Sequence, residues 1–270
     1  MAKADRIAAA IERAERLLYS DPEGCIALCE KTLAEVNDEL DFADLVLLKA
    51  DAELALDDEA AARQSMEDLA GIELDDPVLS CTAGNIWWSL GEEAAAEAAW
   101  RAALAGDDTL ADAHHGLGQI AELRGDGDAM IGHWLRTLEL DAGTPPPEWH
   151  LAVDEFERIA EAAMAELPRE VLDRLENVPV MIADLPDRHL VEEGWDPRLL
   201  GLFSGVPLPE KSQVSGQAPH IDTVHLYQLN LERACADREQ LAEEIRITVL
   251  HETAHFFGLD DDDLDELGLG

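Results

Sequence analysis

Near the C-terminus, two histidines flank a glutamate at a spacing that suits chemistry on a helix. His251 and His255 are four residues apart, so a helix would place both imidazoles on one face, where they can bind one metal ion. Glu252 follows the first histidine and is rotated from it by about 100° around such a helix. From there its carboxylate can take a proton from a metal-bound water without being a ligand itself. The spacing predicts a Zn²⁺ site of the H-E-x-x-H type, with Glu252 as general base.

The residues after His255 extend this pattern. Gly258 permits a sharp turn at the end of the helix, and Asp261 follows three residues later. A carboxylate oxygen is an acceptable zinc ligand, so Asp261 is predicted, by its spacing, to be the third ligand. Four nearby carboxylates are alternatives, namely Asp260, Asp262, Asp263 and, less well placed, Glu266.

Three further side chains flank or lie on the segment before this helix. Tyr227 is on a predicted strand, where a tyrosine can stabilise an oxyanion, but we favour a role in packing or at an interface. His220 and His225 flank the same strand and are interpreted as surface or core residues.

The elements that must position these residues can be read from the hydrophobic pattern. Residues 237–257 predict one long helix that starts polar and becomes apolar on nearly every side, so its far end should be buried. Another helix is predicted within residues 149–168, and strands within 176–186 and 223–231. Residues 199–222 are rich in glycine, serine and proline and are predicted to be a loop. The second half is therefore predicted to be α+β, with a small sheet and a central buried helix.

The first half of the chain repeats with a period of 34 residues. This shift aligns glycines and tryptophans in particular: Gly84 with Gly118, Gly91 with Gly125, and Trp100 with Trp134. The pattern resembles the tetratricopeptide repeat, in which two helices form a hairpin. The resemblance implies a close helix contact at Gly118, a turn at Gly125 and a packing side chain at Trp134. Weaker signs of the same pattern extend the prediction to four hairpins, the first over residues 4–36.

Three consecutive prolines, Pro145 to Pro147, interrupt the helical pattern because proline cannot continue a helix. We therefore expect tetratricopeptide-like helical repeats over residues 1–144 and a second domain over residues 145–270. Stacked hairpins form a solenoid whose concave face often binds a peptide, which predicts a protein partner for the repeats. His114 and His115 are adjacent, so they cannot share one helix face and are assigned no metal role.

The composition is strongly acidic, with 60 aspartates and glutamates against 19 lysines and arginines and a formal net charge of −41. Binding to nucleic acid requires a basic face, so this charge argues against it, and it argues equally against docking on an anionic membrane. Two interpretations of the acidity stay open: a solvated surface that keeps the protein soluble, or adaptation to a habitat of high salt.

The four cysteines form no C-x-x-C pair, which predicts buried thiols and no disulfide framework. The first twenty residues are charged every few positions, unlike a signal peptide, and no apolar run reaches the length of a membrane span. We expect a soluble, cytoplasmic protein.

Residues 148–270 resemble the zincin-like metallopeptidase family with a minimal zincin fold. Three stretches carry the resemblance: the segment GLFSGVPL, the strand around VHLYQ, and the terminus HETAHFFGLDDDDLDELG. It implies a compact core with zinc held by His251, His255 and Asp261, and Glu252 as base. Two departures matter: no methionine follows the site, so the Met-turn of true metzincins is absent, and the family implies peptide hydrolysis without naming a target.

The sequence as a whole predicts a mainly α protein with a small α+β domain: an N-terminal tetratricopeptide-like helical solenoid and a C-terminal minimal zincin-like domain. The favoured function is zinc-dependent hydrolysis of a peptide or protein substrate, with the repeats recruiting substrate or partner. The alternative is a non-catalytic scaffold or regulatory protein with a vestigial or structural zinc site. A structural site closes with four protein ligands, whereas a catalytic one leaves a position for water. A third reading, a binding module without metal, requires the motif to be accidental.

Overall fold

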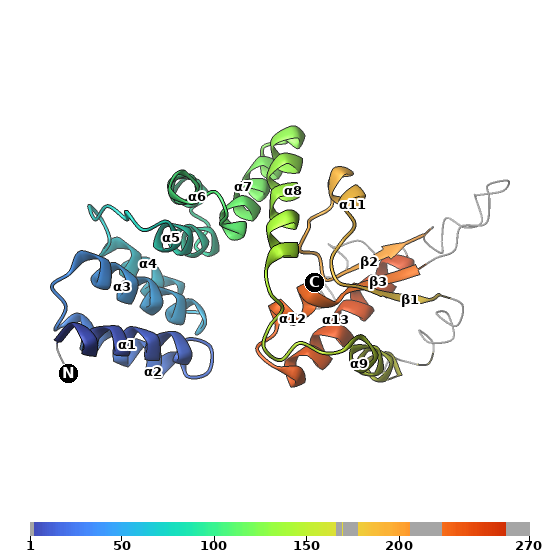
Figure 1. The fold of residues 1–270 in the computed structure, drawn as a ribbon, viewed down its shortest axis with the longest axis horizontal. Helices are drawn as coiled ribbons and strands as arrows, with labels where there is room; N and C mark the ends of the chain where they lie inside the picture. The colour runs from blue at the N-terminus through green and yellow to red at the C-terminus, as the bar shows by residue number, and fades with distance from the viewer. Residues whose placement is uncertain (1–2, 166–168, 170–177, 206–222, 258–270) are drawn as a thin grey trace. The chain divides into compact units, whose positions relative to one another are not determined.

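The computed structural model describes residues 3–165, 169, 178–205 and 223–257. The chain forms two compact units, residues 1–141 and 142–270. The first is helical, and the second combines a three-stranded sheet with helices (Figure 1). The predicted fold class, mainly α with a small α+β domain, is confirmed. The domain boundary between residues 144 and 145 stays a prediction.

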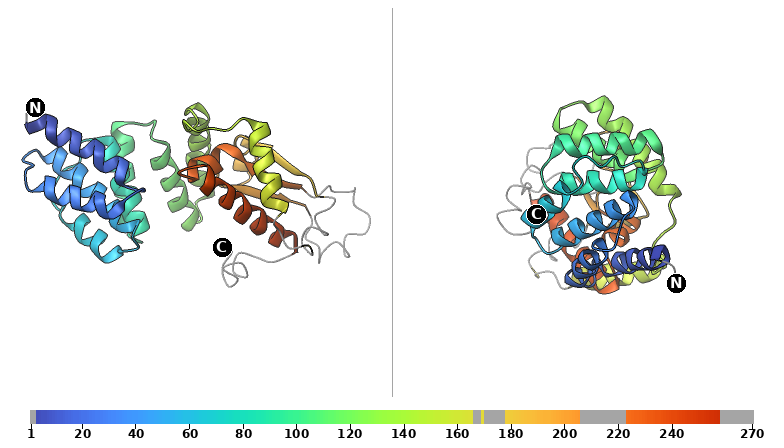
Figure 2. Two further views of the ribbon diagram at one scale, coloured as in Figure 1. Left: turned by 90° about the horizontal axis from the view of Figure 1, so that it is seen from below. Right: turned by 90° about the vertical axis from the view of Figure 1, so that its left-hand side faces the viewer.

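The first unit is a series of helical hairpins that follow one another along its length (Figure 2). Its helices are α1 (Lys3–Leu17), α2 (Pro22–Leu33), α3 (Glu39–Leu54), α4 (Glu59–Glu67), α5 (Pro77–Ser89), α6 (Glu93–Gly106), α7 (Ala111–Leu123) and α8 (Gly127–Gly143). Each odd-numbered helix pairs with the next one, as the 34-residue period predicts.

Aspartate begins several of these helices and accounts for part of the acidic composition. The side chain of each accepts hydrogen bonds from backbone N–H groups in the first turn, which otherwise have no partner within the helix. The N-cap residues of α2, α3, α4 and α5 are Asp21, Asp38, Asp58 and Asp76. A proline follows Asp21 and Asp76 directly, at a position where its missing N–H costs nothing.

The repeated glycines and tryptophans pack as their alignment predicts. A Cβ on Gly84 would lie 2.4 Å from the Trp100 ring, and one on Gly118 would lie 2.2 Å from Trp134. Only glycine therefore allows each indole to lie against the preceding helix. The two indoles differ in one respect. Trp100 Nε1 donates to Asn85 Oδ1 at 2.9 Å, whereas Trp134 Nε1 has no partner among the described residues.

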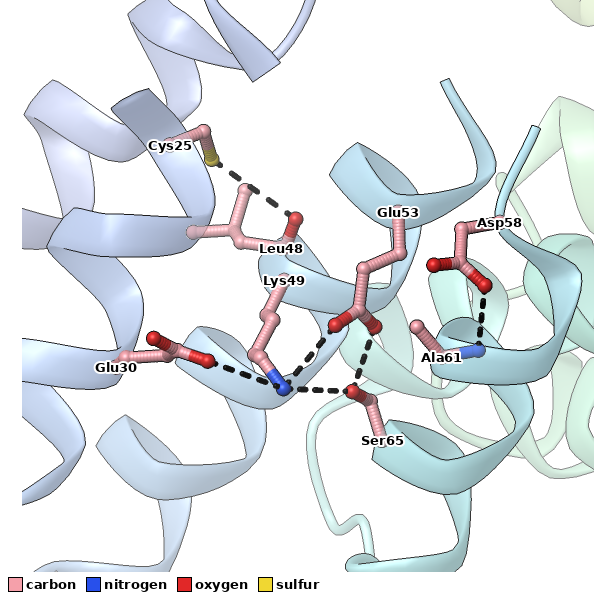
Figure 3. A network of polar contacts seen from close by, with 8 residues as sticks. All are labelled: Cys25, Glu30, Leu48, Lys49, Glu53, Asp58, Ala61 and Ser65. Atoms are coloured by element: carbon pink, nitrogen blue, oxygen red, sulfur yellow. Dashed lines mark hydrogen bonds and ion pairs between the residues drawn. The ribbon is translucent and has the colours of Figure 1, made fainter. Parts of the chain in front are cut away.

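A polar network crosses the interior of the first unit between α3 and α4 (Figure 3). Lys49 Nζ lies 3.1 Å from Glu53 Oε1 and 3.8 Å from Glu30 Oε1, and it donates to Ser65 Oγ at 3.1 Å. Ser65 in turn donates to Glu53 Oε2 at 2.6 Å. Glu53 is only 5% exposed, so the lysine and serine are what allow its charge to be buried.

The second unit contains α9 (Val153–Ala165), β1 (Val180–Ala183), α11 (Arg188–Glu192), β2 (Gly201–Ser204), β3 (Thr223–Tyr227), α12 (Gln228–Ala234) and α13 (Arg238–Phe257). The strand order is β1-β3-β2, with β1 parallel and β2 antiparallel to β3. Helices α9 and α13 lie on one face of this sheet (Figure 1). Their buried side chains form a single core with those of β3.

A buried glutamate of α12 holds the segment that precedes α9. Glu232 is fully buried, and its Oε1 accepts from Leu151 N at 3.1 Å and from Gln228 Nε2 at 2.8 Å. His150 Nδ1 lies 2.6 Å from the other carboxylate oxygen. These contacts hold residues 150–151 against α12, although α12 comes much later in the sequence.

The structure corrects the sequence-based elements in two places. The segment 199–222, predicted to be a loop, contains the strand β2, and residues 206–222 lie outside the described part. The strand predicted over 223–231 ends at Tyr227, where α12 begins. The helix predicted over 237–257 is present as α13, and the strand predicted within 176–186 as β1.

No helix in the described ranges combines the length and apolarity needed to cross a membrane.

Candidate functional site

Helix α13 carries the H-E-x-x-H motif on its last two turns. Asp237 caps its first turn by accepting from Glu239 N at 2.9 Å and from Gln240 N at 3.0 Å. Three side chains at helical spacing then enter the core of the second unit and are fully buried: Leu241, Ile245 and Val249. The same helix continues through residue 257, so His251 and His255 are one turn apart on it. Burial of these three side chains holds α13 in place and so positions the backbone that carries the motif.

Glu252 is buried, with 7% of its surface exposed, and it contacts the edge strand β2. Its Oε2 accepts a hydrogen bond from Phe203 N at 2.6 Å. The register explains why this N–H is available. Tyr227 N donates to Leu200 O at 2.9 Å, and in an antiparallel pair the hydrogen-bonded positions alternate. Phe203 is therefore at a position whose N–H points away from β3, toward the outer edge of the sheet formed by the described strands.

Gly201 lets β2 lie close against α13. A Cβ at this position would be 2.7 Å from Thr248 Cγ2 and 3.0 Å from Glu252 Cγ. It would also be 3.1 Å from the carbonyl oxygen of His225 on β3. Since real Cβ atoms need more room than this, glycine is what allows Glu252 to reach the backbone of β2.

His225 and Tyr227 lie on the sheet face opposite α13. Their neighbours Val224 and Leu226 pack with α13 in the core, and side chains alternate along a strand. Burial lowers the pKa of His225. Burial, with the charges of Glu252 and Asp187 adding to it, raises the pKa of Tyr227 to about 12. At 2% exposure Tyr227 is a core residue, in agreement with the packing role favoured from the sequence.

Part of the predicted site falls outside the described residues. Of His255 the structure gives the helical backbone and not the side chain. Gly258, the predicted third ligand Asp261, its alternatives among Asp260, Asp262, Asp263 and Glu266, and His220 all lie beyond the described ranges. Within those ranges no group of three histidine, cysteine or carboxylate side chains is arranged to hold a metal ion. The metal ligand set therefore stays a prediction.

The residues that are described fit a zinc ion in their chemistry. His251 is partly exposed, whereas the adjacent Glu252 is buried and accepts a hydrogen bond from the backbone of β2. Adjacent residues of a helix are rotated by about 100°, so the imidazole can bind the ion while the carboxylate reaches a water on it without being a ligand. The helix also has the length to bring His255 into line with His251.

Phe203 and Gly201 are two positions next to Glu252 that the sequence pattern did not single out. Both act through the backbone: one offers an N–H, and the other offers the absence of a Cβ. The glycine inside an otherwise apolar run, GLFS, was the available signal, because glycine within a strand often marks a close approach of another element.

The second unit has a counterpart among known families. Residues 175–270 match the family model described as zincin-like metallopeptidase, which confirms the resemblance predicted for the C-terminal part. No curated protein matches the chain. Among solved structures, the chain is similar to that titled "Crystal structure of MamA protein", with 17% identity and a TM-score of 0.42. The similarity covers 60% of this chain and 81% of that chain.

Proposed function

We propose that the second unit is a zinc-dependent metallopeptidase that hydrolyses peptide bonds. The observation that carries the proposal is the position of Glu252, buried at the end of α13 and hydrogen-bonded to the edge strand β2, within a segment that matches a zincin-like family. A carboxylate buried and oriented in this way, next to a partly exposed histidine, fits the role of a general base better than that of a solvated surface charge.

His251 and His255 would hold the ion, and Asp261 is proposed as the third ligand. Zinc, when bound, would polarise the substrate carbonyl and bring the pKa of a water molecule toward neutrality. Three protein ligands leave one position for that water, as in other catalytic zinc sites.

Glu252 would take a proton from the attacking water and later deliver it to the nitrogen of the departing amine. The hydrogen bond from Phe203 N fixes one of its oxygens, so the carboxylate reaches the reacting atoms in one orientation. Gly201 permits that contact, and neither residue would touch the substrate through its side chain. Positioning of this kind contributes to rate because a displaced base transfers protons less well.

The repeats of the first unit would recruit a protein substrate or bind a partner, since stacked helical hairpins present a continuous surface. We also propose a cytoplasmic location. The four cysteines, Cys25, Cys29, Cys81 and Cys235, are buried and form no disulfide, as is usual in a reducing compartment.

Metal analysis of the full chain tests the ligand assignment. We expect one zinc per chain in the wild type, loss of that zinc in His251→Ala, and its retention in Glu252→Gln, because the glutamate is not a ligand. An absence of bound zinc in wild-type protein purified without chelators would overturn the proposal. Four protein ligands on the ion, measured by X-ray absorption, would instead favour the structural site of a scaffold protein.

A further inference from the structure

A cavity of about 300 Å³ opens in the first unit between α1, α3 and the start of α5. Part of its lining is aliphatic and comes from Leu40, Leu47, Leu48, Val78 and Leu79. Leu40 and Val78 are large apolar side chains with exposures of 50% and 57%. The cavity therefore offers apolar surface to a ligand. Its volume is at the lower end of the range found for small-ligand sites, about 300–1,000 Å³.

Four carboxylates from three elements line the same cavity: Glu15, Asp44, Asp51 and Asp76. Burial raises the pKa of Asp44 to about 6, and the negative charges of Glu15, Asp41 and Asp76 add to the effect. Burial likewise raises the pKa of Asp51, which is hydrogen-bonded to Tyr19. Glu15 and Asp76 thus lie close enough to Asp44 to disfavour its ionisation.

No cation of the chain relieves this repulsion within the described residues. No lysine or arginine lines the cavity there, and Asp44 has neither a hydrogen bond nor an ion pair. The lysine of α3, Lys49, is engaged elsewhere, with Glu53, Glu30 and Ser65 (Figure 3). Buried Glu53 therefore has its counter-charge, whereas Asp44 in the cavity lacks one.

The arrangement does not suit a metal ion. Among the described residues no three carboxylates or other ligands converge on a common point, as a bound Ca²⁺ or Mg²⁺ requires. The charges are instead spread around an aliphatic lining. A cation that matches both features must carry apolar surface next to its charge.

We propose that this cavity is a docking site for a segment of a partner protein in which a lysine or arginine is flanked by aliphatic side chains. The cationic group would reach the carboxylates, while its methylene stem and the neighbouring side chains would cover the leucines and Val78. The proposal concerns the repeats alone, so it does not depend on hydrolysis by the second unit.

Fluorescence anisotropy with a labelled peptide tests this proposal on the full-length protein. The probe contains the sequence LKLRL between glycine–serine ends. Two analogues separate its features: one replaces both basic residues by glutamine, and the other replaces the leucines by serine. The protein variant Asp44→Asn/Asp51→Asn removes two charges from the cavity and keeps the side-chain size. Asp68→Asn/Glu73→Gln removes two charges at exposed positions outside it and is the matched control.

We expect the cavity variant to bind the probe about tenfold more weakly and the control less than about twofold more weakly. Both analogues should also lose about tenfold. Val78→Ser, at an exposed position, should weaken binding of the probe without changing the fold, which circular dichroism checks. Equal weakening in the cavity variant and the control would overturn the proposal, because binding would then reflect the net charge alone. Undiminished binding of the serine analogue, or no measurable binding of the probe, would overturn it as well.

Discussion

Replacing Gly201 by alanine tests whether the edge strand β2 must lie tightly against α13. The added Cβ would be 2.7 Å from Thr248 Cγ2 and 3.1 Å from the His225 carbonyl oxygen. Thr248 is buried and β-branched, so its methyl group has little freedom to rotate away. The carbonyl oxygen belongs to the backbone of β3 and is fixed by the sheet. Either the strand or the helix must therefore shift.

The expected cost follows from this crowding. Overpacking a buried site by one methyl group costs about 1–3 kcal/mol, and we expect a loss of that size in the free energy of unfolding of the second unit. The shift also separates Phe203 N from Glu252 Oε2, which are 2.6 Å apart in the native structure. Because a misplaced base transfers protons poorly, peptide hydrolysis should fall by about ten- to a hundredfold, with zinc content unchanged.

The chain supplies a matched control for the same chemical change. Gly132 lies within α8, and a Cβ there would meet nothing within 4 Å. Gly132→Ala should therefore stabilise the first unit by about 0.5–1 kcal/mol, since alanine favours the helix. Urea denaturation, followed by hydrogen exchange of peptides from each unit, measures both effects. An unchanged free energy of unfolding in Gly201→Ala would refute the close packing of β2 on α13.

Three further substitutions test other parts of the structure. Trp100→Phe should cost about 1 kcal/mol more than Trp134→Phe in chemical denaturation, because only Trp100 donates to Asn85; equal costs would contradict this. The pKa of Asp44 is raised from 3.8 to about 6, so its ionisation destabilises the fold as pH rises through that window. Asp44→Asn should therefore raise the melting temperature above pH 6 and leave it unchanged below pH 4, and a gain of the same size at both would disprove the assignment. Glu232→Ala removes the buried acceptor of three contacts and should destabilise the second unit by about 3–5 kcal/mol; a loss under 1 kcal/mol would show that the contacts are weak.

The helical part of the fold was predictable because its signals are local and repeated. Glycine and tryptophan recur at a fixed period, and their packing in the structure follows from that period. Positive φ angles at Gly91 and Gly125, of 75° and 69°, place the turns where the alignment put them. Helix α13 was predictable because its sequence starts polar and becomes apolar on nearly every side toward its C-terminal end.

The small sheet was less predictable, because short strands depend on their partners. β2 consists of four residues in a stretch rich in glycine and proline, and its pairing with β3 is what makes it a strand. The strand prediction for residues 223–231 was too long because Leu229 and Leu231 continue an alternation of polar and apolar residues, although the chain already forms α12 there. Periodicity over so few residues does not separate a strand from a helical turn.

At the candidate site, the sequence predicted which side chains matter but not the backbone N–H group that orients Glu252. His251, Glu252 and their spacing were evident, whereas the hydrogen bond from Phe203 N is invisible in the side-chain types. The roles of His255 and Asp261 remain predictions that rest on their spacing.

The most direct test of the central claim is hydrolysis of a broad peptide library by the zinc-loaded full chain, compared between wild type and Glu252→Gln. If Glu252 is the general base, the wild type cleaves a defined subset of peptides, and the variant retains its zinc while cleaving at least a hundredfold more slowly. Equal cleavage by zinc-loaded wild type and Glu252→Gln, or no cleavage by the wild type, would contradict the account.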